Sequence, residues 1–240
     1  MPDYDARLVD LYDEDNPDGP DHDFYRGIAD ERSAASVLDL GCGTGILTVT
    51  FAQGDRNVVG VDPSANMLDY ARRRAGAERV RWVRGDSRDI PDAGFDLAVM
   101  TGNVAQHIPD TEWGETLRDL RAHVDVGATL TFESRNPARR AWEGWGSEEP
   151  VIRDTLHGPL AEWQEVRELG SGVVELTSHN RFERTCGTVT EVLHLVFRDR
   201  ETLVAQLDAA GFDIEAIYGD WAKTPFDVHH PLLIVVARAR

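Results

Sequence analysis

The sequence predicts an α/β protein with a seven-stranded, mostly parallel sheet, helices on both faces of that sheet, and a small antiparallel β-meander inserted after strand five. Two observations support this prediction. From residue 36 onward, short apolar runs alternate with amphipathic stretches, which is typical of strand–helix crossovers in a parallel sheet. Between residues 134 and 199 the alternation gives way to period-2 runs joined by short glycine-containing turns, which is typical of antiparallel hairpins.

The parallel part of the sheet is predicted from short, buried-type apolar runs. Five runs are expected to be its first strands: residues 37–40, 58–61, 80–84, 95–100 and 128–132. Helices are expected between them, over residues 46–53, 65–74 and 111–123. The pattern resumes later with a helix over 200–210 and strands over 213–218 and 232–237.

The inserted segment begins with an Arg-, Trp- and Gly-rich connection over residues 135–146. Three alternating runs follow, over residues 162–169, 173–182 and 189–197, and the turns between them lie at 170–172 and 184–187. The meander is too small to be a domain. We therefore expect one domain over residues 1–240, with a core formed by 36–133 and 200–238 and with 134–199 as an added sheet that covers the substrate.

The charge of the chain is strongly negative. Its 240 residues hold 25 Lys and Arg against 43 Asp and Glu, a formal net charge of −18, which disfavours nucleic-acid or membrane partners. Residues 1–31 hold eleven acids and two arginines, so half of the net charge lies in this segment. Within it, residues 13–23 are rich in Pro, Gly and Asp, which favours a loop over a helix.

Several classes of site are disfavoured by residue usage. Lys223 is the single lysine and follows no glycine, which excludes a Walker phosphate loop and a pyridoxal Schiff base. Cys42 and Cys186 are 144 positions apart and His229-His230 has no acid or cysteine at ligand spacing, so no metal site is expected. No secretory signal and no apolar run of roughly 20 residues is visible, so a cytoplasmic location is expected.

A glycine-rich loop follows the first predicted strand. It has the spacing G-x-G-x-G at Gly41, Gly43 and Gly45, and Ile46 stands where the dinucleotide fingerprint continues, which argues against a nicotinamide oxidoreductase. Asp39 stands two residues before the first glycine. Asp62, at the end of the second strand, lies 21 residues beyond Gly41, close to the position expected of a ribose-binding acid.

With these motifs the chain resembles the class I S-adenosylmethionine (SAM)-dependent methyltransferases, most clearly in VLDLGCGTGILT over residues 37–48. The resemblance implies a Rossmann-like fold and SAM as cofactor, with S-adenosylhomocysteine as its product. It implies that Asp62 binds the ribose hydroxyls, that Met67 covers the adenine and that Asp86 accepts from the adenine amino group. The cofactor-binding residues it implies are Asp39, Gly41, Cys42, Gly43, Gly45, Asp62, Pro63, Met67, Asp86, Ser87, Asn103, Tyr12 and Tyr25. Helix caps and turns are the alternative roles for the three strand-end acids Asp39, Asp62 and Asp86.

Candidate catalytic and substrate-binding residues come from the segments next to this site. His107 follows the fourth strand and is the candidate general base, with packing at a helix start as the alternative. The resemblance implies that Tyr12 and Tyr25 fold over the cofactor, although they could instead pack within a helix. Arg135, Trp142 and Trp145 follow strand five and could cage a flat or charged acceptor, or fill the core of the added sheet.

The sequence therefore predicts N- or O-methylation of a small-molecule acceptor by in-line displacement in a closed pocket. The expected partners are the small-molecule acceptor and, at most, a second copy in a homodimer. A nucleic-acid methyltransferase and a non-catalytic SAM-binding protein are the alternatives. We also predict that the acidic residues 1–31 form a lid, in which Asp13, Asp15, Asp18 and Asp21 favour cationic ligands.

Overall fold

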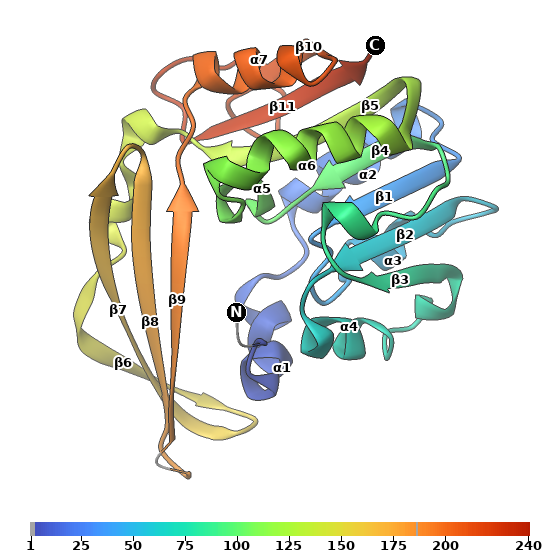
Figure 1. Cartoon of the computed structure of the whole chain (residues 1–240). Coiled ribbons are helices and arrows are strands. Elements are labelled where there is room, and N and C mark those ends of the chain that lie inside the picture. The colour runs from blue at the N-terminus through green and yellow to red at the C-terminus, as the bar shows by residue number, and fades with distance from the viewer. Residues whose placement is uncertain (1–2, 186) are drawn as a thin grey trace.

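The computed structural model describes residues 3–185 and 187–240, and of Glu148 the backbone alone. These residues form two separate sheets, one of seven strands and one of four (Figure 1). Cys186, assigned to a meander turn and discussed as a metal ligand, lies outside the described residues. Among the described residues no helix is long and apolar enough to cross a membrane.

The seven-stranded sheet has the order β10-β11-β5-β4-β1-β2-β3. Its first five strands are parallel: β1 (Ser36–Leu40), β2 (Asn57–Asp62), β3 (Val80–Arg84), β4 (Phe95–Met100) and β5 (Val124–Arg135). Next to β5 lies β11 (Leu232–Ala239), which is antiparallel both to β5 and to the edge strand β10 (Phe212–Tyr218). One reversed strand makes the sheet mostly parallel, as the sequence predicted.

Helices cover both faces of this sheet, which confirms the predicted fold class. Alternate strand residues such as Leu38 and Val59 pack on one face with Trp113 of α6 and Leu203 of α7. Their neighbours pack on the other face with the helices α2 and α3, for example through Phe51. The helices of the core are α3 (Thr48–Phe51), α4 (Ala65–Ala71), α5 (Val104–His107), α6 (Asp110–His123) and α7 (Arg200–Ala209). Short 3-10 turns lie at η1 (Ala77–Arg79), η2 (Ser87–Asp89), η3 (Pro137–Arg139) and η4 (Ala141–Gly144).

The N-terminal acidic segment is helical, so the predicted loop over 13–23 is wrong for most of its length. Helix α1 (Ala6–Asp15) begins at Asp5, whose carboxylate accepts from the Arg7 amide, and α2 (Pro20–Glu31) begins with a proline at its first position. Acidic residues in the first turn of α2 face the positive end of the helix dipole. Glycine and proline therefore mark the break at residues 16–19 between two helices.

The second sheet has four strands where the sequence predicted three. It consists of β6 (Ser147–Thr155), β7 (Gly158–Gly170), β8 (Val173–Phe182) and β9 (Gly187–Val196), each antiparallel to the next. The missed strand β6 is an edge strand that contains Pro150, and its pairing with β7 shifts register between Ser147 and Val151. A proline and a shifted register remove the period-2 pattern by which strands are recognised.

Helix α1 connects the two sheets, and Figure 1 shows it between them. On the side of the second sheet, Arg153 of β6 bonds to Asp15 at 2.7 Å, and Leu11 packs against Leu160 and Phe182. On the core side, Asp13 accepts hydrogen bonds from Thr44, at 2.6 Å, and from Arg74. Helix α1 is thus held against the second sheet on one side and against the core on the other.

Candidate functional site

The glycine loop after β1 adopts a backbone conformation that side chains disfavour. Gly41, Gly43 and Gly45 have φ of +81°, +52° and +72°. A Cβ on Gly45 would come within 2.5 Å of the Trp82 ring, whereas a Cβ on Gly43 would meet nothing within 4 Å. The loop therefore packs tightly against Trp82 at Gly45 and faces open space at Gly43.

Asp39 is a buried acid at the end of β1. Its Oδ2 accepts a 2.6 Å hydrogen bond from the Thr48 hydroxyl, and its Oδ1 is buried with no partner among the described residues. Burial raises the pKa of Asp39 to about 7, the Thr48 bond opposes this rise, and the nearby carboxylates Asp62 and Glu133 add to it.

Asp62 ends β2 beside the glycine loop. Its two carboxylate oxygens accept from the backbone amides of Ser64, at 2.8 Å, and of Gly43, at 2.9 Å. Burial raises its pKa, although these two amides oppose the effect. Met67, one turn into α4, is buried, whereas Pro63 is exposed. The structure thus brings Asp62 and Gly43 into direct contact.

The residues at the end of β3 have partners elsewhere. Asp86 caps the turn η2 and pairs with Arg88, whose hydrogen bond lowers the pKa of the Asp86 carboxyl. The Ser87 hydroxyl donates a 2.6 Å hydrogen bond to Asp119 of α6. Both side chains are therefore occupied by contacts within the core, unlike the free Oδ1 of Asp39.

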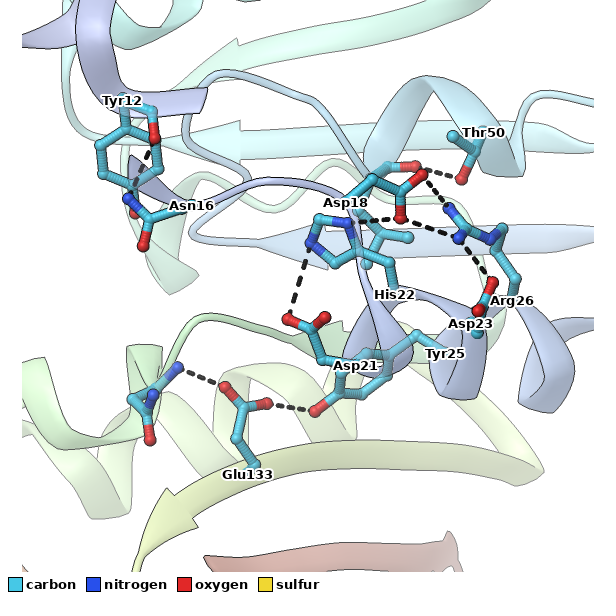
Figure 2. Close-up of polar contacts among 12 residues, drawn as sticks. Tyr12, Asn16, Asp18, Asp21, His22, Asp23, Tyr25, Arg26, Thr50 and Glu133 are labelled. Carbon is cyan, nitrogen blue, oxygen red and sulfur yellow. Dashed lines mark hydrogen bonds and ion pairs between the residues drawn. The ribbon is translucent and has the colours of Figure 1, made fainter. Parts of the chain in front are cut away.

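Sequence reasoning missed Glu133, which lies near the end of β5 and is only 3% exposed. One carboxylate oxygen accepts from the Tyr25 hydroxyl, as Figure 2 shows. The other accepts from the Asn103 amide. Burial raises the pKa of Glu133, and these two bonds oppose the rise. An acid at the carboxyl end of a strand, the signal used for Asp39 and Asp62, would have identified it, but the strand was predicted to end at residue 132.

Tyr12 and Tyr25 have different surroundings. Tyr25 is fully buried and supports Glu133, so it faces the protein. Tyr12 is half-buried, and its hydroxyl makes no hydrogen bond within residues 3–185 and 187–240. Burial, with the charges of Asp62, Asp13 and Glu133, raises the pKa of Tyr12, so its hydroxyl stays protonated near these acids. Of the two tyrosines, Tyr12 is the one available to a ligand.

His107 is the last residue of α5 and has an exposed side chain. Desolvation by the surrounding protein, with a smaller contribution from Arg135, lowers its pKa to about 4. Because the side chain reaches solvent, water screens part of the repulsion between His107 and Arg135. His107 is a neutral imidazole near pH 7.

The three predicted acceptor-binding residues separate into two groups. Trp142 is buried against Phe197, and its indole N–H donates to Glu168 at 2.7 Å, so it belongs to the core of the second sheet. Arg135 and Trp145 are half-buried, and the Arg135 guanidinium lies 5.0 Å from the Trp145 ring centre. These two form a cation–π pair where the chain leaves β5.

Cys42 is a packing residue of the glycine loop. Its side chain is buried, and a Cβ on Gly60 of β2 would lie 3.0 Å from its sulfur. Burial raises the pKa of the Cys42 thiol well above its usual value, so it remains protonated. Within the described part of the chain, no group of three His, Cys, Asp or Glu side chains could hold a metal ion.

The strand ends fit SAM. Asp39 Oδ1, Asn103 Oδ1 and Gln106 Nε2 are buried polar atoms with no partner in the described ranges, and Gly43 leaves open space beside them. Asp62 and the glycine loop would hold the ribose and Met67 the adenine, while the unpartnered polar atoms would bind the amino-acid end. When bound, SAM supplies a methyl group on a positively charged sulfonium.

Comparison with known proteins identifies the family of the chain. A family model described as a methyltransferase domain matches residues 37–127. An uncharacterized methyltransferase of Mycobacterium tuberculosis is 38% identical over 157 residues, which are 60% of this chain and 75% of the relative. The chain belongs to the class I SAM-dependent methyltransferases.

Three other matches cover different shares of this methyltransferase. A cypemycin N-terminal methyltransferase from a Streptomyces species is 27% identical over 214 residues, 84% of this chain and 82% of that protein. The rabbit glycine N-methyltransferase is 30% identical over 130 residues, and the match covers 46% of this chain and 44% of that enzyme. The structure of a sugar N-methyltransferase from Streptoalloteichus superposes with a TM-score of 0.77 over 100% of this chain and 96% of the other, at 20% identity, which shows a shared fold.

Proposed function

We propose that this methyltransferase transfers the methyl group to the nitrogen of a small-molecule amine, in a pocket closed by α1 and the second sheet. The observation that supports this proposal is the cluster of buried strand-end acids Asp39, Asp62 and Glu133. None of the three makes an ion pair with Lys or Arg among the described residues. Asp39 is close enough to the other two for their charges to raise its pKa.

A site of this charge favours cationic ligands. Burial disfavours the ionised carboxylates, so a positive charge placed among them is stabilised. The sulfonium of SAM provides one such charge, and an ammonium group of the acceptor provides a second. An alcohol carries no charge and gains nothing from these acids. The names of two matched proteins, an N-terminal and a sugar N-methyltransferase, support the same preference.

The nitrogen must be neutral before it attacks the methyl carbon. A protonated amine has no free electron pair, so one proton has to move to a base. His107 is the proposed base because it stands directly after the β4 loop; its pKa of about 4 leaves the imidazole unprotonated near pH 7 but makes it a weak base. After methyl transfer the positive charge lies on the product nitrogen, close to the same acids.

Two acids of residues 1–31, Asp13 and Asp15, hold α1 against the core and the second sheet. Asp13 is bonded to Arg74 and Thr44, Asp15 to Arg153, and Asp18 to Arg26 and His22. Figure 2 shows the Asp18 contacts and places Asp21 near the Tyr25–Glu133 pair. These acids therefore differ from the free negative field predicted from the sequence, and Asp21 is the one with a charge that reaches Glu133.

The electrostatics also favour a small acceptor over a nucleic acid. A net charge of −18 repels phosphates, and several arginines on or near α4 and β3 are paired with acids. Such pairs are Arg72 with Asp69, Arg74 with Asp13, and Arg88 with Asp86.

The test measures release of S-adenosylhomocysteine with acceptors matched in skeleton, for example amino sugars against the parent sugars and amino acids against the hydroxy acids. Product is expected with the amines alone. Glu133→Gln keeps the shape and removes one charge, so it should raise KM for the amine, whereas Glu165→Gln, an exposed acid of β7, should not. Turnover of the hydroxyl compounds alone would show that the acceptor atom is oxygen and overturn the proposal.

A further inference from the structure

One face of the second sheet carries polar side chains in a row across its strands. In the strand register Gln164 of β7 lies opposite Ser178 of β8, which lies opposite Glu191 of β9. Asn180, two residues further along β8, lies on the same face. The row is thus formed by side chains from three strands.

This face looks toward the cofactor site. Leu160 and Phe182 lie opposite each other on it and pack on Leu11 of α1. At the other end, β9 packs against α5, the helix that carries His107. Burial, with the charges of Tyr12, Glu191 and Asp62, raises the pKa of the Tyr4 hydroxyl, so Tyr4 lies near both the row and the cofactor acid.

The four side chains have no partner inside the protein. In the described ranges none makes a hydrogen bond or an ion pair, although Asn180 is only 7% exposed and the other three are half-buried. The opposite face of the same strands behaves differently: His179 bonds to Thr190 at 3.1 Å, and Glu175 accepts from both Arg167 and His194. Among the described residues, none of these four side chains has a polar atom that is both fully buried and unpartnered, so the free groups on the inner face are open to a ligand that can hydrogen-bond to them.

We propose that Gln164, Ser178, Asn180 and Glu191 bind the hydroxyl groups of the acceptor, which makes the acceptor a hydroxyl-rich amine. This inference rests on the proposed amine methylation. The amides and the serine both donate and accept, and the carboxylate accepts, which is the combination that several hydroxyls of one ring require. Cross-strand neighbours lie roughly 5 Å apart, so one ring-sized molecule can contact more than one of them.

The apolar end of the same face limits where hydroxyl groups of the acceptor can be bound. Val166, Leu176 and Leu193 form the next row and pack beside Trp145. The hydroxylated ring is therefore bounded on one side by apolar side chains, beside which Arg135 lies over the Trp145 ring. Polar recognition is confined to the row and its neighbour Asn180.

The test measures binding of two amines by titration calorimetry to the full protein loaded with S-adenosylhomocysteine. The probes are a panel of amino hexoses and amino pentoses, and cyclohexylamine, which has a ring and an amine and no hydroxyl. Gln164→Ala and Ser178→Ala are each expected to weaken the amino sugar about fivefold and to leave cyclohexylamine unchanged. Thr177→Ala is the matched control, since it neighbours Ser178 on the opposite face.

The outcomes separate this inference from the function on which it rests. Unchanged affinity for S-adenosylhomocysteine shows that each variant is folded with an intact cofactor site. If no amino sugar binds the wild type more tightly than cyclohexylamine, or if the row variants weaken both amines equally, the inference is overturned while amine methylation stands. If no amine leads to release of S-adenosylhomocysteine, the proposed function fails.

Discussion

Asp39 makes the stability of the ligand-free protein depend on pH. Its pKa is about 7 in the folded protein against 3.8 for an unperturbed aspartate, and its side chain is buried. A carboxyl whose pKa is raised by folding favours the native state below pH 4 and loses that contribution as pH rises through 7. A tenfold change in a protonation equilibrium is worth about 1.4 kcal/mol, so the Asp39 carboxyl destabilises the fold by about 2 kcal/mol at pH 5 and about 4 kcal/mol at pH 8.

Asp39→Asn removes this titration and keeps an oxygen that can accept from Thr48. Urea unfolding without SAM is measured at pH 5, 6, 7 and 8. The free energy of unfolding of the variant, relative to that of wild type, should increase by about 2 to 3 kcal/mol from pH 5 to pH 8. Asp55→Asn, at an exposed position, removes the same charge and should show no such trend. If the difference in free energy of unfolding between Asp39→Asn and wild type stays constant from pH 5 to pH 8, Asp39 does not ionise as a buried carboxyl with a raised pKa.

Three further changes test other parts of the site. Asp62→Ala should weaken SAM binding about a hundredfold, because the ribose hydroxyls would lose two hydrogen bonds to the Asp62 carboxylate. A thermal shift by SAM equal to that of wild type would show that the ribose acid is misassigned. Tyr25→Phe should lower the free energy of unfolding by about 2 kcal/mol in urea, since a buried carboxylate loses its donor; unchanged stability would mean that water replaces the hydroxyl. Gly45→Ala should lower the free energy of unfolding by about 3 kcal/mol, because residue 45 has a positive φ and its Cβ would clash with Trp82. Gly54→Ala, which also has a positive φ but open space around the Cβ, should lower it by about 1 kcal/mol. Equal losses of stability in the two variants would contradict the clash.

The core of the fold was predictable because its signals are local. An apolar run, a glycine turn and an acid at the strand end lie within ten residues for Asp39 and Gly45, and parallel strands bring such ends to one edge. The strand and helix boundaries of the core accordingly agree with the structure to within a few residues, except that β5 extends further at both ends.

What the sequence did not reveal depends on contacts between distant segments. Glu133 directly follows a predicted strand, which is a local signal, but its bonds to Tyr25 and Asn103 reach across long stretches of chain. The acids of α1 look like a free negative patch until partners such as Arg74 and Arg153 are placed beside them. No local pattern carries that information.

The two ends of the inserted sheet are fastened to the same short helix. Where the chain leaves β5, Arg135 bonds through its backbone amide and its guanidinium to Gln106 of α5. Where it returns to the core, the buried Arg198 donates to the carbonyls of Ala105 and Ile108, on either side of His107. A different sheet grafted between these two arginines would keep the same attachment to α5, so the inserted segment is replaceable without a change in the seven-stranded half.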